Sequence, residues 1–215
     1  MENRPFILTV SHHKGGVGKS TIVVNLANYF AKEGEQVAIL DIDTQGTISS
    51  FYELAGKNYE VPLLSHQSFK DFEELLELRQ YDLIVVDTPP YISEDLAQLY
   101  AISDFVLIPT KPSGKDLITI RRSVEHIAQY IPSHCQKAFV LSQCKAQAKR
   151  LNLDARNDLK EYNIPVLKTV IYDRVATGNY EFSGSSIFST KNEKAKKEFK
   201  ELAEEIFSQL NTTKS

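Results

Sequence analysis

Three features of the 215-residue sequence indicate a three-layer, doubly wound α/β fold with a mainly parallel sheet. Short apolar runs alternate with segments of helical period throughout, with no internal repeat or Pro/Gly-rich linker. These runs are rich in Val, Ile, Leu and Phe and alternate poorly with polar residues, which is typical of strands buried on both faces. A glycine-rich loop joins the first run to a helical pattern. We therefore expect one domain over residues 1–215, with its ligand site at the carboxyl ends of the strands.

The elements follow in order from this alternation. The expected core strands are Phe6–Ser11, Gln36–Asp41, Leu83–Asp87, Phe105–Pro109, Ala138–Ser142 and Val166–Val170. The expected helices are Lys19–Lys32, about Phe69–Leu78, Glu94–Ala101, Lys115–Tyr130, Leu151–Glu161 and Asn192–Leu210. The last helix carries an apolar face of Ala195, Phe199, Leu202, Ile206 and Leu210. Because its lysines give way to glutamates along the helix, this face is expected to pack on the sheet and not on a membrane.

Composition and charge exclude several classes of protein. With 42% hydrophobic residues, 25% charged residues and a net charge of −3, the chain is neither disordered nor globally basic. Cys135 and Cys144 have neither the number for a disulfide scaffold nor CxxC spacing, so we expect reduced thiols. The sequence has no signal peptide and no apolar run of roughly 18 residues, so we expect a cytoplasmic protein.

The loop after the first strand has the composition of a phosphate-binding loop. Its glycines let backbone N–H groups approach a phosphate, and the following helix adds the positive end of its dipole. Lys19 would reach the terminal phosphates and Ser20 would supply a hydroxyl to Mg²⁺. The expected cofactor-binding residues are Lys14, Gly15, Gly16, Val17, Gly18, Lys19, Ser20 and Thr21. The alternative is a glycine turn that only lets the helix pack closely on the strand.

The loop departs from the general pattern GxxxxGK[ST], because His13 stands at the first glycine and Lys14 follows it. His12 and His13 are interpreted as turn residues, since no third metal ligand is nearby in sequence. The pattern KGGxGK[ST] resembles the deviant P-loop of the ParA/MinD family of ATPases, whose first lysine reaches across a dimer to the partner's nucleotide. This resemblance implies ATP and Mg²⁺ as cofactors, a homodimer in the ATP state and a catalytic role for Lys14 and Lys19.

Carboxylates follow the second and third strands. Asp41 and Asp43 occupy alternate positions, so their side chains lie on the same side of an extended chain. The segment resembles the family motif DxDPQG with Thr44 in place of proline, which implies that Asp43 orients the attacking water and Asp41 supports the Mg²⁺ shell. Either aspartate could instead cap a helix that begins near Thr47.

Asp87 ends an apolar run, as expected of a Walker B strand, and Mg²⁺ prefers oxygen ligands. The predicted metal set is therefore Ser20, Asp41 and Asp87. A turn aspartate before Thr88-Pro89-Pro90 is the alternative interpretation.

The resemblance extends over most of the chain, through Leu107–Ser113 and the stretch around Arg174 and Tyr180–Ser186. It is strongest to small ParA partition ATPases, which lack an N-terminal helix-turn-helix domain; only five residues precede the first strand here. Gln143 could read the adenine edge or be a surface loop residue. The candidate DNA-phosphate contacts are Lys145, Lys149, Arg150, Lys168 and Arg174, which a solvated face explains equally well.

The resemblance implies a slow ATPase that dimerises with ATP, binds DNA non-specifically and associates with the nucleoid. A ParB-like or other activator would stimulate hydrolysis, and the cargo would be a plasmid, a chromosome or another body. The alternatives are a P-loop enzyme of metabolism and a MinD-like positioning ATPase.

Overall fold

The computed structural model describes residues 4–43, 46–55, 61–65, 67, 71–174 and 186–212. One sheet of seven strands has the order β3-β2-β4-β1-β5-β6-β7, and every strand pair is parallel. The strands are β1 (Phe6–Val10), β2 (Val37–Asp41), β3 (Leu63–Ser65), β4 (Leu83–Asp87), β5 (Phe105–Thr110), β6 (Gln136–Cys144) and β7 (Val166–Tyr172). Because the order reverses on either side of β1, the predicted doubly wound topology is confirmed.

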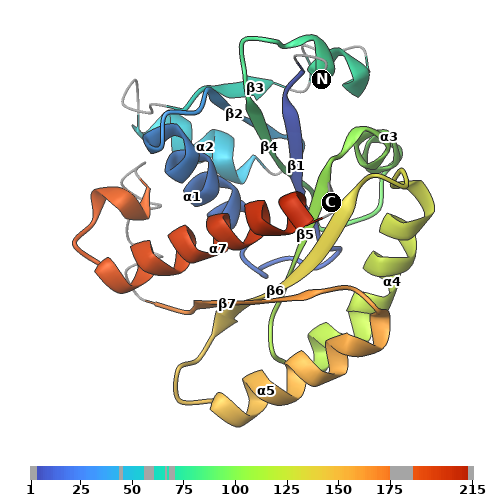
Figure 1. The fold of residues 1–215 in the computed structure, drawn as a ribbon, viewed down its shortest axis with the longest axis vertical. Coiled ribbons are helices and arrows are strands. Elements are labelled where there is room, and N and C mark those ends of the chain that lie inside the picture. The colour runs from blue at the N-terminus through green and yellow to red at the C-terminus, as the bar shows by residue number, and fades with distance from the viewer. Residues whose placement is uncertain are drawn as a thin grey trace.

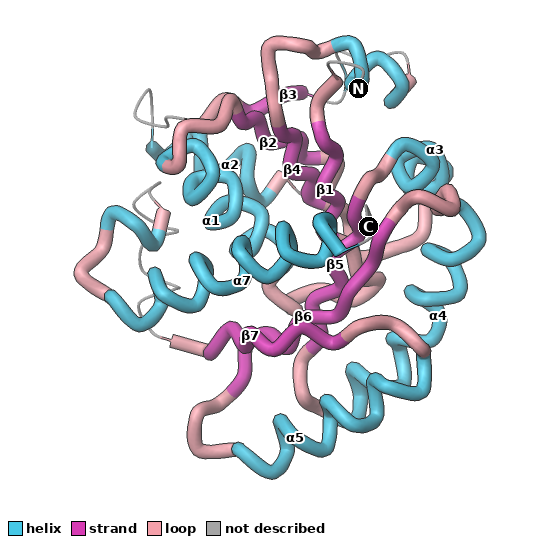
Figure 2. Tube along the Cα trace, viewed as in Figure 1, coloured by secondary structure: helices cyan, strands magenta, loops and turns pink. Residues whose placement is uncertain are grey.

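Helices connect the strands as parallel pairing requires. The α-helices are α1 (Lys19–Lys32), α2 (Thr47–Ala55), α3 (Glu94–Ile102), α4 (Gly114–Tyr130), α5 (Lys149–Asp158) and α7 (Glu193–Thr212). Short 3₁₀ helices are η3 (Phe72–Glu77), η4 (Leu159–Tyr162) and η6 (Ile187–Ser189). Figures 1 and 2 show α1, α2 and α7 on one face of the sheet and α3, α4 and α5 on the other.

The core is divided by the sheet into two apolar clusters. Along β1, Leu8 belongs to the cluster under α1 and α7, whereas Ile7 belongs to the cluster under α3 and α4. Alternate residues of β2 and β4 divide in the same way, so these strands are buried on both faces, as expected. Burial on both faces explains why the sequence of these strands shows apolar runs without alternation.

The structure corrects several predicted elements. β3 was missed because it has three residues and pairs only with β2. The helix expected at about 69–78 is the 3₁₀ helix η3, and residues 68–70 lie outside the described part. β6 and β7 are longer than predicted, and the helix expected to end at Glu161 changes to 3₁₀ geometry at Leu159. β7 also alternates in burial, because it is an edge strand.

The last helix packs against the sheet as predicted. Ala195, Phe199, Leu202 and Ile206 are buried in the cluster shared with α1. The Leu210 side chain lies outside the description. None of the helices in the described ranges is long and apolar enough to cross a bilayer.

Candidate functional site

The sheet order brings the carboxyl ends of four strands together. β2, β4, β1 and β5 are successive neighbours, so the loop after β1 emerges between the ends of β4 and β5. The register aligns Val10 with Asp87 and Asp87 with Asp41. Both predicted carboxylates of the metal set are therefore at the level where the glycine loop begins.

The loop conformation depends on glycine at two positions. Gly16 has φ +70° and Gly18 has φ +90°, both in the left-handed region that side chains disfavour. Gly18 is also the N-cap of α1 and has no side chain to cap it. The positive end of the α1 dipole therefore faces the loop, which is the arrangement that binds a phosphate or another anion.

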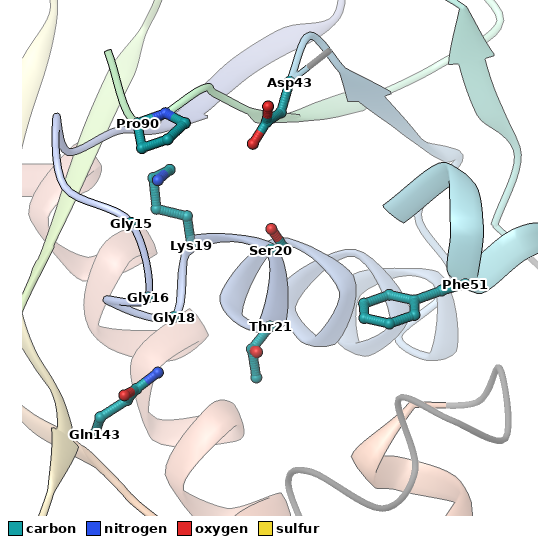
Figure 3. Close-up of a pocket in the computed structure, with 10 residues that line it drawn as sticks. All are labelled: Gly15, Gly16, Gly18, Lys19, Ser20, Thr21, Asp43, Phe51, Pro90 and Gln143. Atoms are coloured by element: carbon teal, nitrogen blue, oxygen red, sulfur yellow. The ribbon is translucent and has the colours of Figure 1, made fainter. Parts of the chain in front are cut away.

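Lys19 is buried at the start of α1. Its Nζ donates to the Lys14 carbonyl over 3.4 Å. Burial lowers the pKa of Lys19, and the nearby carboxylates of Asp87 and Asp43 oppose this shift. Figure 3 shows Lys19 and Asp43 directed into one pocket above Ser20. A buried ammonium beside an open pocket is suited to binding the terminal phosphates of a nucleotide.

Ser20 and Asp87 form the pair expected of a metal site. The Ser20 hydroxyl donates to Asp87 Oδ2 over 2.5 Å, and Asp87 is fully buried. Within the described residues, Asp87 Oδ1 is buried without a hydrogen-bond partner. Burial raises the pKa of Asp87 to about 7, against the effect of the Ser20 hydrogen bond. These oxygen donors fit Mg²⁺, which Ser20 and Asp87 would hold and which would neutralise phosphate charge.

Asp41 has the capping role that the sequence left open. It accepts from the backbone N–H groups of Asp43 at 3.0 Å and of Ser49 at 3.3 Å. Its carboxylate thus links the end of β2 to the first turn of α2, and burial raises its pKa. A place for Asp41 in a Mg²⁺ shell stays a prediction. Asp43 lines the pocket, whereas residues 44 and 45 lie outside the described part.

The pocket brings together most of the predicted nucleotide-binding residues. Its lining consists of Gly15, Gly16, Gly18, Lys19, Ser20, Thr21, Asp43, Phe51, Pro90 and Gln143 (Figure 3). Gln143 has φ +50°, and its Nε2 lies 3.5 Å from where a Cβ on Gly18 would stand. Sequence reasoning missed Phe51 and Pro90. Pro90 follows the Asp87 strand and could have been found from that position, but no pattern around Phe51 indicated a site.

Two residues of the predicted set do not line this pocket. Val17 has a fully buried side chain and its carbonyl accepts from the Ser142 hydroxyl over 2.7 Å, so only its backbone N–H could face a ligand. Lys14 donates its backbone N–H to His12 Nδ1 over 3.1 Å. Its side chain is not part of the lining.

The two histidines of the loop make contacts within the fold. His12 is buried and accepts from the turn, while the His13 ring packs on the His126 ring of α4 at 5.1 Å between centroids. The Ser123 hydroxyl accepts from His13 N–H over 3.1 Å. Burial, with smaller contributions from the positive charges of His126 and Lys19, lowers the pKa of His13 to about 4. Among the described residues, no three His, Cys, Asp or Glu side chains are grouped so that they could hold a metal ion.

The five candidate DNA contacts divide into two groups. Arg174 forms an ion pair with Glu198 and lies 5.5 Å from the centre of the Tyr172 ring, so it is engaged within the chain. The other four, Lys145, Lys149, Arg150 and Lys168, are exposed around the start of α5 and on β7. Of the stretch 180–186, only Ser186 is described.

A glycine loop between a strand and a helix, with lysine and serine at its end and a buried aspartate on the adjacent strand, defines a P-loop nucleotide-binding α/β protein. The chain belongs to the family described as CobQ/CobB/MinD/ParA nucleotide binding domain, which matches residues 8–187. The resemblance to ParA and MinD proteins stated from the loop motif is thereby confirmed.

Known relatives cover nearly the whole chain. The maintenance of carboxysome distribution protein A of Gloeobacter kilaueensis is 30% identical over 206 residues, or 94% of each chain. A structure of a Borrelia burgdorferi protein described as a plasmid partition protein, bound to AMPPNP, has a TM-score of 0.74 at 21% identity and covers 96% of this chain and 100% of its own. The septum site-determining protein MinD of Pyrococcus horikoshii with Mg-ADP has a TM-score of 0.70 at 18% identity and covers 94% and 96%. The two structures share the fold.

Proposed function

We propose that this chain is an ATP-hydrolysing, dimerising ATPase that positions a large intracellular cargo. The observation that carries the proposal is that Lys19, Ser20 and Asp43 line one pocket together with the phosphate loop, while Asp87 accepts a hydrogen bond from Ser20. The similarity to a protein that maintains carboxysome distribution supports a positioning role over a metabolic one. Plasmid or chromosome partition is the same activity on another cargo.

The side chains of the pocket divide the work of hydrolysis. Lys19 and the loop N–H groups hold the terminal phosphates, and Asp43 orients the attacking water from across the pocket. Mg²⁺, held by Ser20 and Asp87 with Asp41 in support, supplies charge neutralisation when bound. Gln143 lies beside the loop, at the position from which we propose that it contacts the base.

Lys14 has no place in the lining of its own pocket, which supports the cross-dimer role that its motif implies. We assign it to the nucleotide of the second copy. Each active site would then be complete only in the dimer, and hydrolysis would be coupled to assembly.

Non-specific DNA binding is proposed for the cations Lys145, Lys149, Arg150 and Lys168, which are exposed around α5 and β7. Because this binding gains from counterion release, a dimer that doubles a modest patch can bind DNA despite a net charge of −3. This activity would place the ATP state on the nucleoid. A ParB-like or other activator would trigger hydrolysis and release.

The first test concerns Lys19. Lys19→Ala should weaken ATP binding by about a hundredfold or more, because the helix dipole cannot replace a full charge at the phosphates. Calorimetry with a non-hydrolysable ATP analogue measures this, and Lys32→Ala, at the far end of α1, is the control. Near-normal affinity in folded Lys19→Ala would remove the phosphate-loop assignment.

The second test separates binding from hydrolysis. Asp43→Ala should bind ATP but hydrolyse it roughly 10²–10⁴-fold more slowly, because it removes the water-orienting carboxylate and leaves the loop intact. Phosphate release, measured with and without double-stranded DNA, gives the rate. Hydrolysis by Asp43→Ala at the wild-type rate would mean that another residue orients the water. A wild-type chain that transfers phosphate to, or otherwise modifies, a small molecule would favour the metabolic alternative.

A further inference from the structure

The phosphate loop is flanked by Pro90 and Lys111, which follow β4 and β5, the two strands that pair with β1. Pro90, after β4, lies 3.9 Å from where a Cβ on Gly15 would stand. Lys111, after β5, places its Nζ 3.9 Å from where a Cβ on Gly16 would stand. The Ser11 N–H donates to the Leu107 carbonyl over 2.9 Å, which ties the start of the loop to the strand that carries Lys111.

Lys111 is held in this position by its backbone. It directly follows β5 and precedes Pro112, and its carbonyl accepts from the Ser113 N–H over 2.8 Å in a tight turn. The residue is half-buried. In the part of the chain that the structure describes, no carboxylate forms an ion pair with its ammonium group.

The charge balance at the pocket favours an additional cation. Lys19 lies near two carboxylates, Asp43 and Asp87, so within one copy these three side chains carry no excess of positive charge. A triphosphate brings about four negative charges to the same place. Lys111 is absent from the lining of the pocket. An effect of its ammonium on bound phosphates would therefore act through the thin glycine loop and not by contact.

We propose that Lys111 is an additional cation of the nucleotide site, beside Lys19 and the Lys14 of the second copy, and that its charge behind Gly16 strengthens binding of the terminal phosphate and favours ATP over ADP. The proposal rests on the nucleotide-binding function proposed above. It assigns Lys111 as a positioning residue that acts through the loop, distinct from Lys19, which meets the phosphates in the pocket.

Calorimetric titration of the full chain with a non-hydrolysable ATP analogue and with ADP tests this role. Lys111→Met keeps an unbranched side chain of similar length without the charge. It should weaken binding of the ATP analogue by about tenfold and of ADP by about threefold, because the triphosphate carries the larger charge. The difference should shrink at 0.5 M salt. Lys111→Arg should restore the preference, and Lys200→Met, exposed on α7, should behave as wild type.

The outcomes separate the inference from the function on which it rests. An unchanged ratio of the two affinities in Lys111→Met, whether neither affinity falls or both fall by the same factor, would overturn the role of Lys111. Nucleotide binding by the wild-type chain would still uphold the proposed function. A wild-type chain that binds neither nucleotide would overturn both. If Lys111→Arg loses the preference for the ATP analogue over ADP as fully as Lys111→Met does, the preference depends on packing of the lysine and not on its charge. This result would also overturn the proposal.

Discussion

Ionisable side chains are buried at the carboxyl ends of β2 and β4 and at the start of α1. Lys19, Asp41 and Asp87 are all buried, although taking a charge out of water is costly unless it is paired. Each has a pKa displaced first by burial. Such displaced groups in one cleft are typical of functional sites, where a ligand supplies the missing charge.

His13 gives the stability of the phosphate loop a pH dependence. Its pKa is lowered from 6.5 to about 4 in the folded chain, so the unfolded chain binds more protons between these two pH values. Stability contributed by the neutral ring is complete above pH 6.5 and is lost as the pH falls toward 4. From pH 7 to pH 5, the free energy of unfolding should therefore fall by about 1 kcal/mol more in wild type than in His13→Phe, after allowance for partial exposure.

Urea titrations of both proteins at the two pH values measure this difference. Phenylalanine keeps the ring contact with His126 and cannot titrate. Parallel pH dependences in the two proteins would contradict the assignment to His13.

At the scale of elements, side chains from two helices form hydrogen bonds with backbone groups of the edge strand β7. Glu205 of α7 accepts from Lys168 N–H at 2.6 Å and from Thr169 N–H at 2.9 Å, at an irregular part of the strand. Arg156 of α5 donates to the carbonyls of Val166, at 3.3 Å, and Leu167, at 2.5 Å. An open edge would otherwise present these groups to other chains.

Glu205→Ala should therefore destabilise the fold by about 2 kcal/mol, because hydrogen bonds from two backbone N–H groups to a charged acceptor are lost. The variant should also aggregate faster on heating, since the edge is exposed. Glu204→Ala is the matched control, because the exposed Glu204 forms only a surface ion pair with Lys200 at 3.7 Å. Equal stabilities of the two variants in thermal unfolding would refute this role of Glu205.

At the scale of the whole molecule, the proposed dimer makes a prediction that a monomeric enzyme does not. Lys14→Ala and Asp43→Ala should each hydrolyse ATP poorly. In a mixed dimer, however, one site combines Asp43 of one copy with Lys14 of the other. An equimolar mixture should therefore recover about a quarter of wild-type activity, since half of the dimers are mixed and each has one intact site.

Phosphate release from the mixture, with each variant alone at the same total concentration, measures this recovery. Size-exclusion chromatography with ATP tests whether the dimers form. A mixture no more active than the average of its components would place Lys14 in the site of its own chain.

Local pattern was enough to predict most of the fold and the centre of the site. The doubly wound topology and the positions of Lys19, Ser20 and Asp87 could be inferred because strand burial, helical period and loop chemistry are set by residues close together in the chain. The contacts of Phe51, Pro90 and Lys111 with the pocket or loop could not, because they depend on how distant strand exits and α2 meet.

Arg174 shows the same limit for a surface charge. The sequence makes it a candidate DNA-phosphate contact or part of a solvated face, but α7 brings Glu198 against it, so the side chain forms an ion pair within the fold. The three-residue β3 likewise exists only through its pairing with β2. Local pattern therefore specifies most of the longer elements, whereas short elements such as β3 and the neighbours of each side chain are fixed only when sheet and helices pack together.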